Sequence, residues 1–328
     1  MRAVAVPGRW VWGLSGLATA AVLIIPGTRL LTTTDGLWNR PPAPDTITRA
    51  LTVDQAVTSL DVQSNGGSVQ VMPGAVRHVQ VTEALSYDGQ DGGPPAVVHS
   101  VSGGRLTLAD PACASSGCTV SFAVIVPSGV AVTVATEGGP ASVAGAAGAN
   151  VDSGGAPMNI AHISGPLTAS TEGGSLQLSD TAEANVASGG GPVTAAQIDG
   201  PLTISTGGGS LQVEGLTGTL RADTGGGPLL MQGVSAATAT ASTGGGSARI
   251  DFSAAPDTVT LNTDGGPAML TVPGGPYAVT AESDGGPQLV GLATDSSARR
   301  SITVTSGGGS LRIGQSAGHS SANPGSQP

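Results

Sequence analysis

The fold of this chain is decided by the stretch Leu-Thr-Ile-Ser-Thr-Gly-Gly-Gly-Ser-Leu-Gln-Val, residues 202–213. Apolar and polar residues alternate on both sides of the glycines, with Leu202 and Ile204 before them and Leu211 and Val213 after them. A period of two is typical of a strand with one buried face. The stretch therefore predicts two short strands that meet at a tight corner.

The same pattern recurs ten times between Thr136 and Ile313 at steps of 17 to 23 residues. A Ser or Thr stands four residues before the anchoring Ser or Pro of each copy, and a Gly stands two residues before it. The anchors are Pro140, Pro157, Ser175, Pro192, Ser210, Pro228, Ser247, Pro267, Pro287 and Ser310. One copy cannot bury its apolar face alone, so copies must stack at ~4.8 Å per turn. We predict an all-β, parallel β-solenoid of about ten to eleven Gly-Gly turn repeats of ~18–20 residues.

The turn residues have structural roles in this interpretation. Glycines at the corner are expected to supply backbone conformations with positive φ. The hydroxyl residue before them is expected to bond to the turn backbone. Many inward positions are alanine, so each coil is weak and stability must come from many stacked coils.

The repeats fix the domain boundaries. An early copy, Leu60 to Val71 with Ser68 as its anchor, precedes the regular array. We expect a solenoid domain over residues 49–314, in which 49–127 form an irregular opening or cap and 128–314 the regular repeats. Residues 315–328 are rich in Ser, Gly, Asn and Pro and predict a disordered tail.

The N-terminus predicts attachment to a membrane. Residues 10–31 contain an apolar run that follows Arg2 and Arg9, which indicates one transmembrane signal anchor with residues 1–9 in the cytoplasm. Residues 32–48 then form a Pro-rich spacer. The predicted location is the cell membrane, single-pass, with the repeats outside the cytoplasm. The alternative is secretion after cleavage near Ala18-Thr19-Ala20.

Cys113 and Cys118 enclose four residues in the predicted exported part, which favours a local disulfide. Two free surface thiols are the alternative. A zinc site is less favoured, because the neighbouring sequence supplies no further ligands.

Charge and motifs exclude several function classes. The chain has a net charge of −10 and no lysine, which argues against nucleic-acid binding. Its four histidines are far apart in sequence, and the glycine-rich turns lack the lysine of a phosphate-binding loop. We therefore expect no catalytic residues, no cofactor and no enzymatic activity.

One turn position varies in a way that could carry chemistry. Three residues before the anchor, an acid replaces Gly at Glu137, Glu172, Asp264 and Asp284. Chain order would place Asp264 and Asp284 on adjacent coils, ~5 Å apart, as weak candidates for a divalent metal site. The alternative is that all four are solvated turn residues.

The chain resembles the putative adhesin family of bacterial β-strand-repeat proteins over roughly residues 51–313. The resemblance rests on the opening strand pair Val62 to Val71, the strand Ala123-Val124-Ile125-Val126-Pro127, and the Ser/Thr-x-Gly-Gly turns after it. It implies an exported or membrane-anchored solenoid that acts in adhesion or surface binding, and it supplies no catalytic residues.

The expected partners are a cell-wall polymer, another cell-surface protein or a second copy of the chain. One alternative function is an envelope-stress or signalling accessory with a solenoid sensor domain. Another is a carbohydrate-active β-helix enzyme, in which Asp264 or Asp284 would act.

Overall fold

The computed structural model describes residues 44–88, 93–114 and 117–316. Residues Ala43–Pro328 form one compact unit, and every buried core side chain lies between Leu60 and Ile313. This unit therefore has its own hydrophobic core, as a self-contained folding domain requires. The predicted anchor at 10–31 lies outside the described residues, and so does most of the predicted tail, residues 317–328. Within the described ranges, no helix has the length and apolar character needed to span a bilayer.

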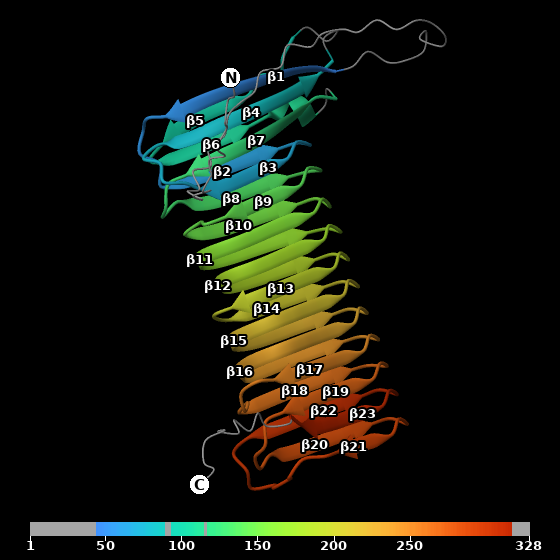
Figure 1. Cartoon of the computed structure of the whole chain (residues 1–328). Coiled ribbons are helices and arrows are strands. Elements are labelled where there is room, and N and C mark those ends of the chain that lie inside the picture. The colour runs from blue at the N-terminus through green and yellow to red at the C-terminus, as the bar shows by residue number, and fades with distance from the viewer. Residues whose placement is uncertain (1–43, 89–92, 115–116, 317–328) are drawn as a thin grey trace, which may run out of the picture. The chain divides into compact units, whose positions relative to one another are not determined.

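The unit is a parallel β-solenoid, as the repeats predict (Figure 1). Each regular coil has one strand before the glycine corner and one after it. Both strands pair in parallel with the next coil, so Leu202 lies opposite Leu220 and Leu211 opposite Leu229. The alternating pattern sets which side chains face inward, and Leu202 and Leu211 are each only 1% exposed.

The strands form two ladders. In spatial order, the ladder before the glycine corner contains β6 (Arg105–Ala109), β2 (Ser59–Ser64), β8 (Ala131–Thr136), β10 (Gly148–Ser153), β11 (Met158–Thr171), β12 (Leu176–Ser188), β14 (Leu202–Thr206), β15 (Leu211–Thr224), β16 (Leu229–Thr243), β18 (Thr258–Thr263), β22 (Ser301–Ser306) and β20 (Ala278–Ser283). The long strands β11, β12, β15 and β16 belong to both ladders. Each bends at a second corner of the coil, which contains the fifth residue after the anchor, namely His162, Asp180, Gly215 or Gly233.

The ladder after the glycine corner also runs through those four long strands. In spatial order it contains β7 (Thr119–Val126), β3 (Val69–Pro73), β9 (Ala141–Ala144), β11, β12, β13 (Val193–Ile198), β15, β16, β17 (Ala248–Phe252), β19 (Ala268–Val272), β23 (Leu311–Gln315) and β21 (Gln288–Val290).

The corner glycines are required for a reason other than the predicted one. In the regular coils most of them do not have a positive φ. Instead, a Cβ built on Gly209 would lie 2.0 Å from the carbonyl oxygen of Gly191 in the preceding coil, whereas one on Gly208 would meet nothing within 4 Å. The prediction of positive φ was therefore wrong here, because the glycines permit the backbones of successive corners to approach closely.

The hydroxyl before the corner bonds to the turn backbone, as predicted, in every described coil except the one that carries Thr136. The Oγ1 atom of Thr206 donates to the carbonyl oxygen of Gly209 at 2.9 Å, and that of Thr263 donates to Gly266 at 2.6 Å. Both threonines are buried, at 2% and 0% exposure. The side chain thus satisfies a turn carbonyl that faces the interior.

The N-terminal end is a mixed cap. Strands β2 and β3 stack directly against β8 and β9, so the early copy is continuous in space with the regular array. The chain between β3 and β8 forms β4 (Val79–Tyr87), β5 (Val98–Ser102), β6, the 3-10 segment η3 (Pro111–Ala114) and β7. The pairs β1–β4, β4–β7 and β5–β6 are antiparallel, whereas β6 and β7 pair in parallel with β2 and β3. The predicted parallel arrangement therefore extends only in part into the cap. Strand β1 (Asp45–Val53) begins inside the predicted spacer.

At the C-terminal end, the order of the coils in space differs from their order in sequence. Strand β22 pairs with both β18 and β20, and β23 pairs with both β19 and β21. After β18 and β19, the chain therefore leaves one coil position open and forms the outermost coil with β20 and β21. It then returns, and β22 and β23 fill the open position. The last described coil lies inside the stack (Figure 1).

Candidate functional site

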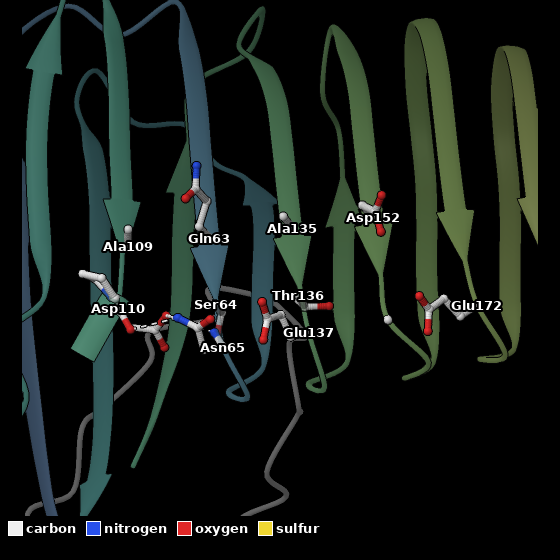
Figure 2. A pocket seen from close by; sticks show the side chains of 12 residues that line it. Gln63, Ser64, Asn65, Ala109, Asp110, Ala135, Thr136, Glu137, Asp152 and Glu172 are labelled. Atoms are coloured by element: carbon white, nitrogen blue, oxygen red, sulfur yellow. Dashed lines mark hydrogen bonds between the residues drawn. The ribbon is translucent and has the colours of Figure 1, made fainter. Parts of the chain in front are cut away.

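A polar cleft lies along the glycine corners where the cap meets the first regular coils (Figure 2). Its volume is about 700 Å³. The lining residues are Gln63, Ser64, Asn65, Ala109, Asp110, Pro111, Ala135, Thr136, Glu137, Asp152, Gly154 and Glu172. Four of them are carboxylic acids and none is basic, so the cleft favours cationic or hydrogen-bond-donating ligands.

Two of the predicted turn acids contribute to this cleft. Glu137 and Glu172 lie on either side of Gly154, whose N–H donates to the carbonyl of Thr136. Their backbones are therefore two coil spacings apart, roughly 10 Å. Figure 2 shows both carboxylates on their turns, with Asp152 on the strand between them. The side chain of Asp152 accepts a hydrogen bond of 2.8 Å from Ser170.

The wall of the cleft on the cap side is fixed by Asp110. Its Oδ1 accepts hydrogen bonds from the backbone N–H of Asn65 at 3.0 Å and from the side-chain amide of Asn65 at 2.9 Å. Asp110 is fully buried, and its Oδ2 has no hydrogen-bond partner. Burial raises the pKa of Asp110, the hydrogen bonds from Asn65 oppose this rise, and the charge of Glu137 adds to it.

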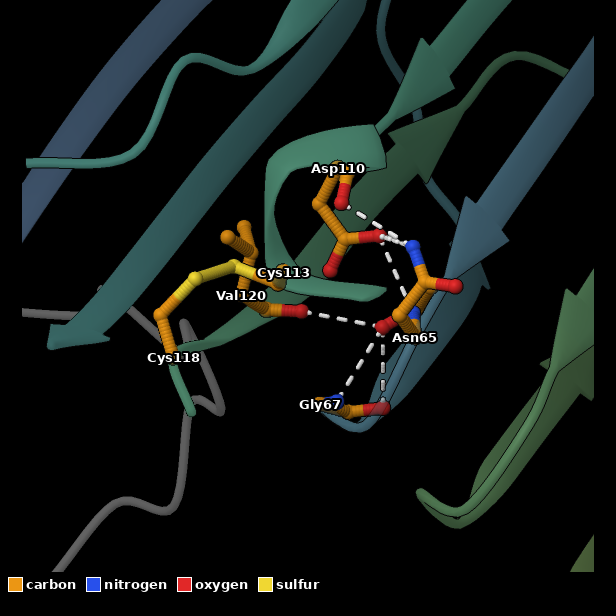
Figure 3. The surroundings of a disulfide bond; sticks show 7 residues. Asn65, Gly67, Asp110, Cys113, Cys118 and Val120 are labelled. Atoms are coloured by element: carbon orange, nitrogen blue, oxygen red, sulfur yellow. Dashed lines mark hydrogen bonds between the residues drawn. A yellow bond between two sulfur atoms is a disulfide. The ribbon is translucent and has the colours of Figure 1, made fainter. Parts of the chain in front are cut away.

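The disulfide lies next to this wall. The sulfur atoms of Cys113 and Cys118 are bonded at 2.08 Å, and Figure 3 shows the bond beside the contacts between Asp110 and Asn65. Because the bridge closes the segment that follows Asp110, it restricts the loop that carries this wall.

Thr136, which also lines the cleft, departs from the regular corner pattern. Ten of the eleven hydroxyl side chains at this position in the described coils make a hydrogen bond, namely Ser64, Ser153, Thr171, Ser188, Thr206, Thr224, Thr243, Thr263, Ser283 and Ser306. The buried Oγ1 of Thr136 makes none. The corner that carries Glu137 is therefore the least satisfied of the eleven.

The other two turn acids are separated by the reversed coil order. Asp264 and Asp284 lie on either side of Gly307, so they are not on adjacent coils and the predicted spacing of ~5 Å is wrong. Both line a smaller pocket of about 210 Å³ together with Glu282. Among the residues that the structure describes, no group of three or more His, Cys, Asp or Glu side chains is placed to hold a metal ion.

The structure also pairs two histidines that sequence spacing left isolated. The Nε2 atom of His99 contacts Oε1 of the buried Glu83 within the cap. On the second corner of the coil, the Nδ1 atom of His162 lies 3.2 Å from Oδ2 of Asp180. His162 and Asp180 are one repeat apart, and that separation was the available sequence signal.

No protein-family model matches the chain, and no curated protein is significantly similar to it in sequence. Several solved structures match it over most of its length. One described as a putative adhesin from Parabacteroides distasonis has a TM-score of 0.41 at 13% identity, covering 82% of this chain and 97% of that one. A putative adhesin from Parabacteroides merdae has a TM-score of 0.39 at 12% identity, covering 82% and 95%. A putative lipid binding protein from Parabacteroides distasonis has a TM-score of 0.36 at 11% identity, covering 82% and 96%.

Proposed function

We propose that this protein is a non-enzymatic surface-binding module of the bacterial envelope, and that the cleft at the cap is its ligand site. The observation that carries the proposal is the cleft itself, which places four carboxylic acids and two hydroxyl side chains around about 700 Å³ without a basic side chain. Rigid parallel coils on one side and the bridged cap on the other fix these groups in place.

The side chains of the cleft define the chemistry of its ligand. Carboxylates at Glu137 and Glu172 accept hydrogen bonds and attract positive charge, while Gln63 and Asn65 add amide groups. A wall or surface polymer with amino and hydroxyl groups has the matching donors. Because Glu137 and Glu172 lie on turns two coils apart, we expect the ligand to extend along the stack rather than across it.

We further propose that residues 10–31 hold the module in the membrane with the repeats outside the cytoplasm. The apolar run and the preceding arginines support this orientation. The test is protease treatment of intact cells that carry an epitope in the repeat domain. Loss of the epitope is expected, and its full protection in intact cells but not in lysed cells would contradict the proposal.

The binding proposal is tested by capture from envelope material on immobilised residues 43–328. A variant with Glu137→Gln and Glu172→Gln should lose most of the captured ligand. The matched control is Asp264→Asn with Asp284→Asn, which changes the same turn position at the other end and should retain capture. Equal capture by the two double variants would exclude the cleft as the ligand site. A wild-type protein that captures nothing would overturn the proposed binding function.

A further inference from the structure

The second corner of the coil contains three residues in an unusual backbone conformation. His162, Asp180 and Gln197 have φ values of 55°, 51° and 55°, and they are the non-glycine residues with positive φ among those described. All three occupy the fifth position after the anchor, in three successive coils. They therefore form one row on a corner that is separate from the glycine corner and its cleft.

Glycine occupies the same position in the neighbouring coils. Gly145 precedes the row, and Gly215 and Gly233 follow it, with φ values of 68°, 70° and 66°. The left-handed conformation disfavours residues that have a Cβ, and glycine adopts it freely. The chain thus carries three polar side chains where its own repeats show that glycine fits, which makes the row a candidate functional site.

The geometry of the first two residues suits shared ligation. The Nδ1 atom of His162 and the Oδ2 atom of Asp180 are 3.2 Å apart. Two ligands on a tetrahedral zinc ion, with bonds of about 2.0 to 2.1 Å, are separated by roughly 3.3 Å. The side chains are 67% and 38% exposed, so an ion and its water molecules can reach both atoms.

We propose that His162 and Asp180, with the amide oxygen of Gln197 in the next coil, form a surface site for a divalent transition-metal ion such as Zn²⁺. Imidazole and carboxylate are ligands that zinc accepts, and water completes the coordination. An exposed ion pair between His162 and Asp180 contributes little to stability, so it does not account for the unfavourable backbone. The site is independent of the proposed function of the cleft.

The test uses residues 43–328 and Zn²⁺ alone, with calorimetric titration and thermal unfolding followed by circular dichroism. The wild type should bind one ion at this site and unfold at a higher temperature with Zn²⁺ than without it. His162→Gly and Asp180→Gly should each weaken this binding at least about tenfold. Without metal, both variants should be at least as thermostable as the wild type, because glycine relieves the left-handed backbone.

His78→Gln is the control for other histidines and should leave the affinity for Zn²⁺ unchanged. Two results would overturn the proposal. One is an affinity for Zn²⁺ that is the same in the wild type, His162→Gly and Asp180→Gly. The other is a lower unfolding temperature of His162→Gly in the absence of metal, which would show that the imidazole stabilises the corner itself.

Discussion

Both ends of the solenoid are formed by chain that leaves the stack and then returns, but the two ends are closed differently. At the N-terminal end, the returning chain adds antiparallel strands and a disulfide around β6 and β7. At the C-terminal end, it adds one more parallel coil, and all three residues of its strand β21 are exposed. The cap changes strand direction and so ends the parallel stacking, whereas the other end leaves an edge of the same kind as every inner coil.

This difference assigns separate roles to the two ends. The cap buries Leu106, Leu108 and Phe122 to within 1% exposure, while Leu289 and Val290 at the open end are 54% and 37% exposed. We expect the cap to carry more of the unfolding free energy than the open end. The predictions below test that expectation, from the largest effect to the smallest.

Leu108→Ala should lower the free energy of unfolding by about 2 to 5 kcal/mol, because it leaves a cavity in the fully buried core of the cap. Leu289→Ala removes the same atoms at the open end and should change it by less than about 0.5 kcal/mol. Urea unfolding followed by circular dichroism measures both. Equal effects of the two substitutions would show that the ends contribute alike.

Gly309→Ala should lower the free energy of unfolding by about 1 to 3 kcal/mol. Its Cβ would lie 2.3 Å from the carbonyl oxygen of Gly266, so the inserted coil would have to move away from its neighbour. Gly308→Ala meets nothing within 4 Å and serves as the control in the same urea series. A neutral Gly309→Ala would show that the inserted coil is loosely held.

Replacement of both Cys113 and Cys118 by Ser should lower the free energy of unfolding by roughly 2 kcal/mol, the value that loop entropy gives for so short a loop. The loss should also reduce ligand capture, since the bridge restrains the cap wall of the cleft. Comparison of the oxidised wild type with the reduced wild type provides the control. If the variant captures as much ligand as the wild type, the disulfide is not needed to hold the cap wall of the cleft in place.

Asp110→Asn should change stability by about 1 kcal/mol or less, in a direction that depends on pH. Burial holds the folded-state pKa of Asp110 above that of the unfolded chain. The stability that this group contributes is therefore complete below the unfolded value of about 3.9 and is lost as pH rises through the folded value. The stability of Asp110→Asn relative to the wild type should therefore rise from pH 4 to pH 7, as measured by the unfolding temperatures of both proteins. A difference in unfolding temperature that does not change with pH would contradict this cause.

Much of the fold could be predicted from local sequence, because each coil repeats the same pattern of two alternating strands around a glycine corner. The alternation around Thr206 and Ser210 specified two strands with inward faces, and the hydroxyl of Thr206 was correctly expected to bond to the turn. The role of the corner glycines was missed, since the close approach of Gly209 to Gly191 arises between coils and leaves no trace within one copy.

The candidate site was predicted in part. The variable turn position that the sequence singled out includes Glu137 and Glu172, and both side chains line the cleft. The cap side of that cleft could not be predicted, because Asp110 reaches Asn65 across 45 residues of irregular chain. The coil that lies between Asp264 and Asp284 also could not be predicted. The alternation of apolar residues specifies which face of a strand is buried, but it does not specify which coil the strand pairs with.

The insertion of β22 and β23 between earlier coils has a consequence for the order of synthesis. Strands β22 and β23 follow β20 and β21 in the sequence, so the coil that contains β20 and β21 is synthesised before the coil against which it packs. Until residues 301–315 enter, that coil faces a gap one strand wide. A cut in the chain between residues 291 and 300 would therefore free residues 301–315 from their covalent link to the outermost coil. Only the hydrogen bonds of β22 and β23 would then hold this segment between the outermost coil and the rest of the stack.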